Sequence, residues 1–107
     1  MNQQRQQYRI PIERTGRITR DEVVSDCHVA DLTEQGFQIQ TKIPLAIGEV
    51  VRLTCPLDLH TEIECGIAVT HARSPVFGTR IVDIAPDQQE RLARFIQRLI
   101  TLSMMGL

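Results

Sequence analysis

Alternating apolar and polar residues run along most of the chain from residue 10 to residue 84. Six segments carry this alternation, at residues 10–20, 23–30, 36–41, 49–55, 62–71 and 76–84. A period of two predicts β-strands with one buried side and one solvent-facing side. Because no helical pattern separates these segments, we expect an all-β domain with antiparallel strands, either a barrel or a sandwich.

The segment at residues 62–71 shows the clearest alternation. One of its two sides carries Ile63, Cys65, Ile67, Val69 and His71. We expect this side to face the core. His71 stands at the end of the apolar side, and we interpret it as a structural histidine.

The last element is predicted to be a helix over residues 86–102. Pro86 suits the first helical position, and Asp87 places a negative charge at the positive end of the helix dipole. Apolar residues recur at the spacing of one helix face, namely Leu92, Phe95, Ile96, Leu99, Ile100 and Leu102. We expect this face to cover an end or a face of the barrel. The apolar tail at 104–107 indicates further packing or a frayed end, with a homodimer contact as the alternative to a monomer.

Length and composition favour a single domain over residues 1–107. We expect a flexible polar arm at 1–9, the barrel at 10–84 and the helix at 86–102. With 42% apolar and 23% charged residues, the chain resembles ordinary soluble domains. It has no run of about 18 apolar residues and no apolar core of a signal peptide near residue 1. We therefore expect a cytoplasmic protein without membrane insertion.

Positive charge is concentrated near the N-terminus. Residues 1–20 carry five arginines and one acid, whereas residues 21–107 carry seven basic and twelve acidic residues. A basic segment on an acidic body favours an anion at that segment and argues against a broad nucleic-acid surface. Eleven of the twelve cations are arginine, whose planar fork pairs with phosphate or a guanine edge.

The motifs of common catalytic sites are missing. The chain contains no Gly-x-Ser-x-Gly elbow, no phosphate-cradling glycine loop and no His-Glu-x-x-His. The three cysteines, Cys27, Cys55 and Cys65, form no Cys-x-x-Cys pair and have no zinc-type spacing with the histidines. Cys27 and Cys65 occupy apolar strand positions, which indicates buried free thiols. We expect no enzymatic activity, no metal and no cofactor.

The stretch from Asp31 to Gly36 lies between two of the predicted strands. Asp31 and Thr33 have side chains that bond nearby backbone N–H groups and nucleate turns. Gly36 can take the positive φ angle that other residues resist. Taken alone, the stretch is a hairpin turn.

Two motifs together carry a resemblance to a known family. Residues 5–9, Arg-Gln-Gln-Tyr-Arg, resemble the Arg-x-x-x-Arg motif of PilZ domains. Residues 31–36, Asp-Leu-Thr-Glu-Gln-Gly, resemble the family's Asp/Asn-x-Ser-x-x-Gly motif, in the same order and at a similar spacing. The loop at 44–48 and the strand at 77–81 also resemble the family's pattern.

The resemblance implies a six-stranded antiparallel barrel with a C-terminal helix, and the bacterial second messenger cyclic di-GMP as ligand. Arg5 and Arg9 are then expected to bind its phosphates and guanines. Asp31 would accept from guanine N1–H and N2–H, Thr33 would supply a hydroxyl, and Gly36 would let the ligand approach closely. The arm would order over the bound ligand. Two further candidates beside the ligand are Gly78 and Arg80.

Three positions depart from the family's pattern. Thr33 stands where serine is usual, and its methyl group adds bulk to the motif. Ile81 replaces an aromatic residue. Gln4 precedes Arg5 where members that bind a ligand dimer tend to carry another arginine, which favours one ligand molecule per domain.

Three functions fit these observations. The first is a cyclic di-GMP receptor that signals to an unidentified protein partner in motility, secretion or exopolysaccharide control. The second is a PilZ-like adaptor without nucleotide, in which Arg5 and Arg9 belong to a solvated terminus. The third is a barrel for single-stranded nucleic acid, which the few aromatic residues argue against. In each case we interpret Arg14, Arg17 and Arg20 as exposed strand residues.

Overall fold

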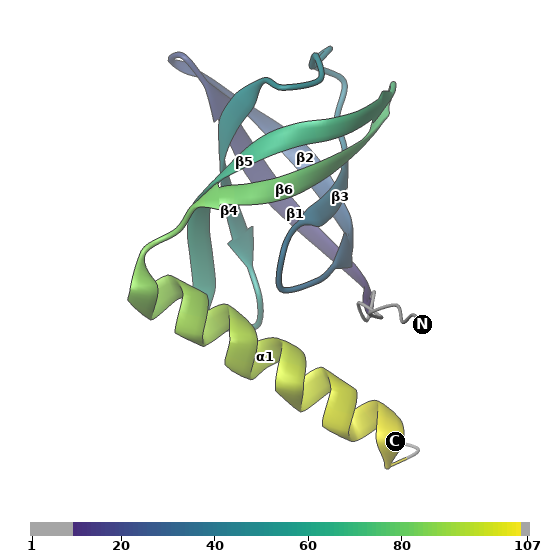
Figure 1. Cartoon of the computed structure of the whole chain (residues 1–107), viewed down its shortest axis with the longest axis vertical. Helices are drawn as coiled ribbons and strands as arrows, with labels where there is room; N and C mark the ends of the chain where they lie inside the picture. Colours follow the sequence, from purple (N-terminus) through teal and green to yellow (C-terminus); the bar gives the residue numbers. More distant parts are fainter. Residues whose placement is uncertain (1–9, 106–107) are drawn as a thin grey trace, which may run out of the picture.

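The computed structural model describes residues 10–105, and they form a closed barrel of six antiparallel strands with one helix (Figure 1). The elements are β1 (Ile10–Arg20), β2 (Val23–Leu32), β3 (Phe37–Gln40), β4 (Val50–Pro56), β5 (Glu62–Arg73), β6 (Val76–Asp83) and α1 (Pro86–Met104). This architecture confirms the predicted fold class. The helix ends two residues later than expected, and β2 and β5 each extend two residues further.

The order of strands around the barrel is β1-β2-β3-β6-β5-β4, and β4 pairs with β1 to close it. Two pairings join strands that are not consecutive in the chain, because β3 pairs with β6 and β4 pairs with β1. Within residues 10–105, each strand therefore has a paired neighbour on both sides. The topology therefore brings the turn that follows β2 beside the middle of β6.

Apolar side chains of all six strands fill the interior. Cys27, Cys55 and Cys65 belong to this core, which confirms the buried thiols expected at Cys27 and Cys65. Burial raises the pKa of Cys27 and Cys65 to about 11 and that of Cys55 to about 12. The thiols are therefore protonated and weakly reactive at neutral pH. Residues 10–105 contain no cluster of side chains able to hold a metal ion.

Helix α1 lies across one end of the barrel, and its C-terminal part extends past the barrel wall (Figure 1). Leu92, Phe95 and Ile96 are buried in the core, whereas Met104 is exposed. Leu99 and Ile100 are partly buried against the core, so the apolar face covers the barrel end until the last turn of the helix. Among the described residues, this helix is not apolar enough to cross a membrane.

Two arginines of β1 are not the exposed strand residues that we expected. Arg14 is half-buried, and its Nε and Nη2 donate to the carbonyl oxygen of Leu57 at 3.1 and 3.0 Å. Its guanidinium also lies 6.0 Å from the ring centroid of Phe95, within reach of a cation–π contact. Arg20 is half-buried as well, whereas Arg17 is exposed as predicted. Arg14 and Arg20 thus have structural partners.

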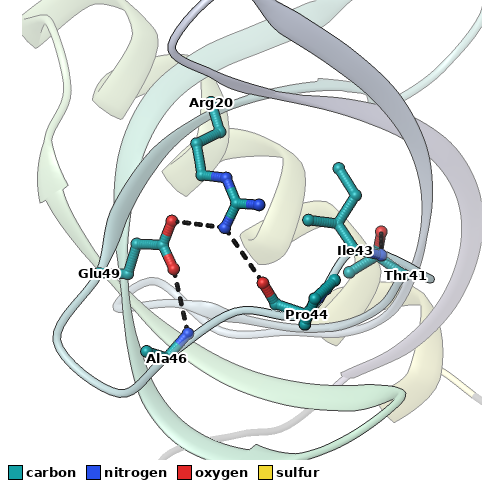
Figure 2. Close-up of polar contacts among 6 residues, drawn as sticks. All are labelled: Arg20, Thr41, Ile43, Pro44, Ala46 and Glu49. Atoms are coloured by element: carbon teal, nitrogen blue, oxygen red, sulfur yellow. Dashed lines mark hydrogen bonds and ion pairs between the residues drawn. The ribbon is translucent and has the colours of Figure 1, made fainter.

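Arg20 organises the loop between β3 and β4, at the barrel end away from α1 (Figures 1 and 2). Its Nη1 donates to Glu49 Oε2 at 2.8 Å and to the Pro44 carbonyl at 3.0 Å. The Ala46 N–H donates to the other carboxylate oxygen of Glu49 at 3.0 Å. Hydrogen bonding by Arg20, and then by the Ala46 backbone, holds the pKa of Glu49 below its ordinary value.

We predict that Glu49→Gln lowers the free energy of unfolding by about 0.5 kcal/mol at neutral pH, because it removes this ion pair. A lowered folded-state pKa stabilises the protein above the ordinary pKa of about 4.3 and no longer does so once the pH falls through the folded value. Urea unfolding at about pH 7 and about pH 3 should therefore show a larger difference between wild type and variant at the higher pH.

Glu90→Gln is the matched control, since Glu90 pairs with Arg94 at 3.5 Å and both side chains are about 70% exposed. This exposed pair should change the stability less. Equal effects of the two variants at both pH values would contradict the role assigned to Glu49.

Candidate functional site

A pocket of about 380 Å³ opens between the turn after β2 and the paired strands β5 and β6. Its lining residues are Asp31, Leu32, Thr33, Gln35, Gly36, Phe37, Gln38, Thr70, His71, Gly78, Thr79 and Arg80. All five predicted site residues within the described part of the chain belong to this set: Asp31, Thr33, Gly36, Gly78 and Arg80. The two remaining predicted residues, Arg5 and Arg9, lie outside the described residues.

Asp31 is the acidic residue of the pocket, and it belongs to β2 rather than to the turn. It pairs in register with Pro11 of β1 and with Gln38 of β3, and β-bulges interrupt both ladders beside it. The side chain is half-buried and makes no hydrogen bond or ion pair with another residue of 10–105. Its carboxylate oxygens are thus open to donors that enter the pocket.

The turn after β2 is built around the Thr33 hydroxyl. Its Oγ1 accepts hydrogen bonds from the N–H groups of Gln35 and Gly36, each at 3.0 Å. The Thr33 N–H donates to the Gly36 carbonyl at 2.9 Å and closes the turn. The two acceptor positions of the hydroxyl are therefore used within the turn, so Thr33 shapes the pocket wall.

Gly36 is needed for close approach of two backbones, not for a positive φ. The expected positive φ is wrong, because the only such glycine in residues 10–105 is Gly48. A Cβ at Gly36 would overlap the carbonyl oxygen of Thr79 and lie 3.0 Å from the Cα of Arg80. The absent side chain thus allows the turn to pack directly on β6.

Hydrogen bonds on either side of Gly36 fix this contact. Ile81 N–H donates to the Gln35 carbonyl at 2.7 Å. The buried Thr79 hydroxyl donates to the Phe37 carbonyl at 2.9 Å and accepts from the Phe37 N–H at 3.3 Å. The sequence analysis did not identify Thr79. A threonine next to a glycine within a strand is a pattern that could have indicated a hydroxyl hydrogen-bonded to a neighbouring backbone.

Arg80 lies on β6 at the pocket and is exposed. Its guanidinium makes no ion pair or hydrogen bond with the other residues that the structure describes. It is therefore free to bind an anion, as expected for the candidate beside the ligand.

The inward position predicted for His71 is wrong. A β-bulge in β5 places Thr70 as an extra residue, so that Val69 pairs with Thr79 but His71 pairs with Gly78. The strand changes phase there, and the His71 side chain is exposed at the pocket instead of buried in the core. Perfect alternation in the sequence concealed this bulge.

We predict that Gly36→Ala destabilises the fold by about 1–3 kcal/mol, because the added Cβ overlaps fixed backbone. Chemical unfolding measures the loss. Gly66→Ala is the control, since its Cβ would overlap no atom: the nearest are the Asp83 Cβ at 3.2 Å, the end of the flexible Arg52 side chain at 3.3 Å and the Asp83 carbonyl oxygen at 3.7 Å. A Gly36→Ala variant as stable as Gly66→Ala would rule out the tight contact.

We also predict that Thr33→Ser leaves stability nearly unchanged, whereas Thr33→Val lowers it by about 1–2 kcal/mol. Serine keeps the oxygen that accepts two backbone hydrogen bonds, and valine removes it while keeping the branched shape. Urea unfolding of the two variants checks this. Equal stability of the valine and serine variants would show that the hydroxyl does not hold the turn.

Comparisons with known proteins agree with this geometry. A scan against protein-family models matches residues 3–98 to the PilZ domain. A search of curated proteins finds no match. Among solved structures, the chain is similar to the Bacillus subtilis inhibitor of motility MotI/DgrA, with a TM-score of 0.70 and 20% sequence identity. The alignment covers 94% of this chain and 53% of that one, so this chain spans about half of that protein's length.

Proposed function

The chain belongs to the PilZ domain family, and on this premise we propose that it is a receptor for cyclic di-GMP that signals to a protein partner. Domains of this family are regulatory rather than catalytic. The observation that carries the proposal is the pocket that gathers Asp31 from β2, Gly36 from the turn, and Gly78 and Arg80 from β6. Those residues come from two distant parts of the chain, and they meet because β3 pairs with both β2 and β6.

The chemistry of this pocket suits a guanine nucleotide with phosphodiester groups. Asp31 offers an unpaired carboxylate, which accepts from the N1–H and N2–H groups of guanine. Arg80 offers an unpaired guanidinium, which pairs with phosphate or with the O6/N7 edge of guanine. The turn held by Thr33 supplies the floor beside them.

Few residues of chain separate the N-terminal arginines from the strand that begins beside this pocket. Ile10 is the first residue of β1 and pairs with Leu32, which lines the pocket. Arg9 directly precedes Ile10, and Arg5 is five residues before it, so its Cα lies within about 18 Å of the Ile10 Cα even in a fully extended chain. We propose that both arginines bind the ligand and that this binding orders the arm as the output signal.

The output of the proposed receptor is a contact with another protein in the bacterial cytoplasm. The solved neighbour is named as an inhibitor of motility, which supports motility as one pathway for such a partner. Secretion and exopolysaccharide control are the other pathways. An adaptor that uses the same barrel without nucleotide is the second candidate; Thr33, where the family usually has serine, is the departure from the motif on which it rests.

We predict saturable binding of cyclic di-GMP in calorimetric titration. Asp31→Ala should weaken it about ten- to a hundredfold, because each charge-assisted contact contributes roughly 1.5–3 kcal/mol. Arg9→Ala should abolish measurable binding, since it removes phosphate pairing at the start of the arm. Added salt should weaken the wild-type complex.

Arg17→Ala is the matched control, because Arg17 is an exposed β1 arginine that does not line the pocket. It should bind like wild type. Folded wild-type protein that releases no heat with cyclic di-GMP would refute the receptor and favour the adaptor. Normal binding by both Arg5→Ala and Arg9→Ala would exclude the arm from the site.

A further inference from the structure

Three features of the local structure define where the His71 side chain lies. The bulge at Thr70 turns the side chain away from the core and toward the pocket between β2 and β6. The Thr70 hydroxyl lies 3.2 Å from His71 Nδ1, within hydrogen-bond distance. On the neighbouring strand, the residue paired with His71 is Gly78.

The missing side chain of Gly78 provides the space for the imidazole. A Cβ at Gly78 would lie 3.3 Å from His71 Nδ1 and 3.4 Å from His71 Cβ. The ring therefore lies against the bare backbone of β6 at Gly78, two residues from Arg80. His71 thus lies at the pocket. Its side chain is exposed and contributes nothing to the packing of the core.

We propose that His71 is a ligand-binding residue of this pocket, which donates a hydrogen bond from Nε2 to an acceptor of the bound dinucleotide and makes binding tighten as the pH falls. This inference rests on the proposed function. When Nδ1 accepts from the Thr70 hydroxyl, the proton of the neutral ring lies on Nε2, which is then a donor. Protonation of the ring makes that hydrogen bond charge-assisted.

The charges around the pocket explain why one added proton matters. Within residues 10–105, the charged groups that line it are Asp31 on β2 and Arg80 on β6, and their charges cancel. Gln38 faces the same pocket from β3 without charge, and Arg73 lies two residues along β5. A protonated His71 gives the lining a net positive charge, and the ligand carries two phosphodiester charges. Histidine is the side chain that changes charge most readily between about pH 5 and pH 8.

The test is calorimetric titration with cyclic di-GMP at about pH 6 and about pH 8, where neither the phosphodiesters nor the guanines of the ligand change protonation. We expect wild type to bind about three- to tenfold more tightly at the lower pH. His71→Gln keeps a neutral donor, so it should retain the affinity of wild type at the higher pH and lose the dependence on pH. His71→Ala should bind more weakly than wild type at both values.

His60→Gln is the matched control, because His60 is an exposed histidine that does not line the pocket. It should keep the full pH response, and thermal unfolding should show all variants folded. A pH response in His71→Gln as large as in wild type would overturn the inference and leave the receptor intact. Wild-type protein that binds no cyclic di-GMP at either pH would overturn both.

Discussion

The close approach of Gly36 to the backbone of β6 is the contact on which the site depends. Two main chains pack so tightly there that a methyl group at residue 36 would overlap a carbonyl oxygen. Hydrogen bonds from Ile81 to the Gln35 carbonyl and between Thr79 and Phe37 lock the contact from both sides. These contacts extend the attachment between the short strand β3 and β6, whose ladder comprises three residue pairs.

The same contact sets the shape of the pocket. It brings the turn after β2, which follows Asp31, against the strand that carries Gly78 and Arg80. An acceptor from β2 and a donor from β6 thereby face one cavity although they lie about fifty residues apart in the chain. The contacts that pack the turn on β6 thus also set the shape of the pocket, and a side chain at residue 36 would disturb both.

Alternation of apolar residues was sufficient to predict six antiparallel strands, because burial of one strand face imposes a period of two. The helix followed from the spacing of its apolar face, and the choice of a barrel over a sandwich came from the resemblance to PilZ domains. Alternation failed where the backbone departs from the period of two. The bulge at Thr70 moves His71 from the predicted core side to the pocket, and a bulge leaves no mark in a regular alternation. Arg14 was also misjudged, because its partner Leu57 lies in a distant loop that the pattern of β1 does not reveal.

The motif residues were identified correctly as neighbours, and Thr33 bonds nearby backbone N–H groups as predicted, but Gly36 allows close packing instead of taking a positive φ. A glycine in a turn is compatible with ligand contact, with a positive φ or with close packing of two backbones. A hydroxyl in a turn is compatible with ligand contact or with hydrogen bonds to the backbone. The neighbouring atoms decide between these roles. At Gly36 the deciding neighbour is the carbonyl of Thr79, and at Thr33 it is the pair of N–H groups that its own oxygen accepts.

The replacement of serine by threonine in the motif is compatible with the turn for the same reason. The turn requires one oxygen at Oγ, and serine and threonine both supply it. Thr33 directly follows the end of β2, where an extended backbone suits a β-branched residue. The side chain is half-buried, so the methyl group is partly removed from water. The substitution therefore preserves the hydrogen bonds of the turn, and Thr33 supports the wall of the pocket while the charged groups that line it within residues 10–105 are those of Asp31 and Arg80.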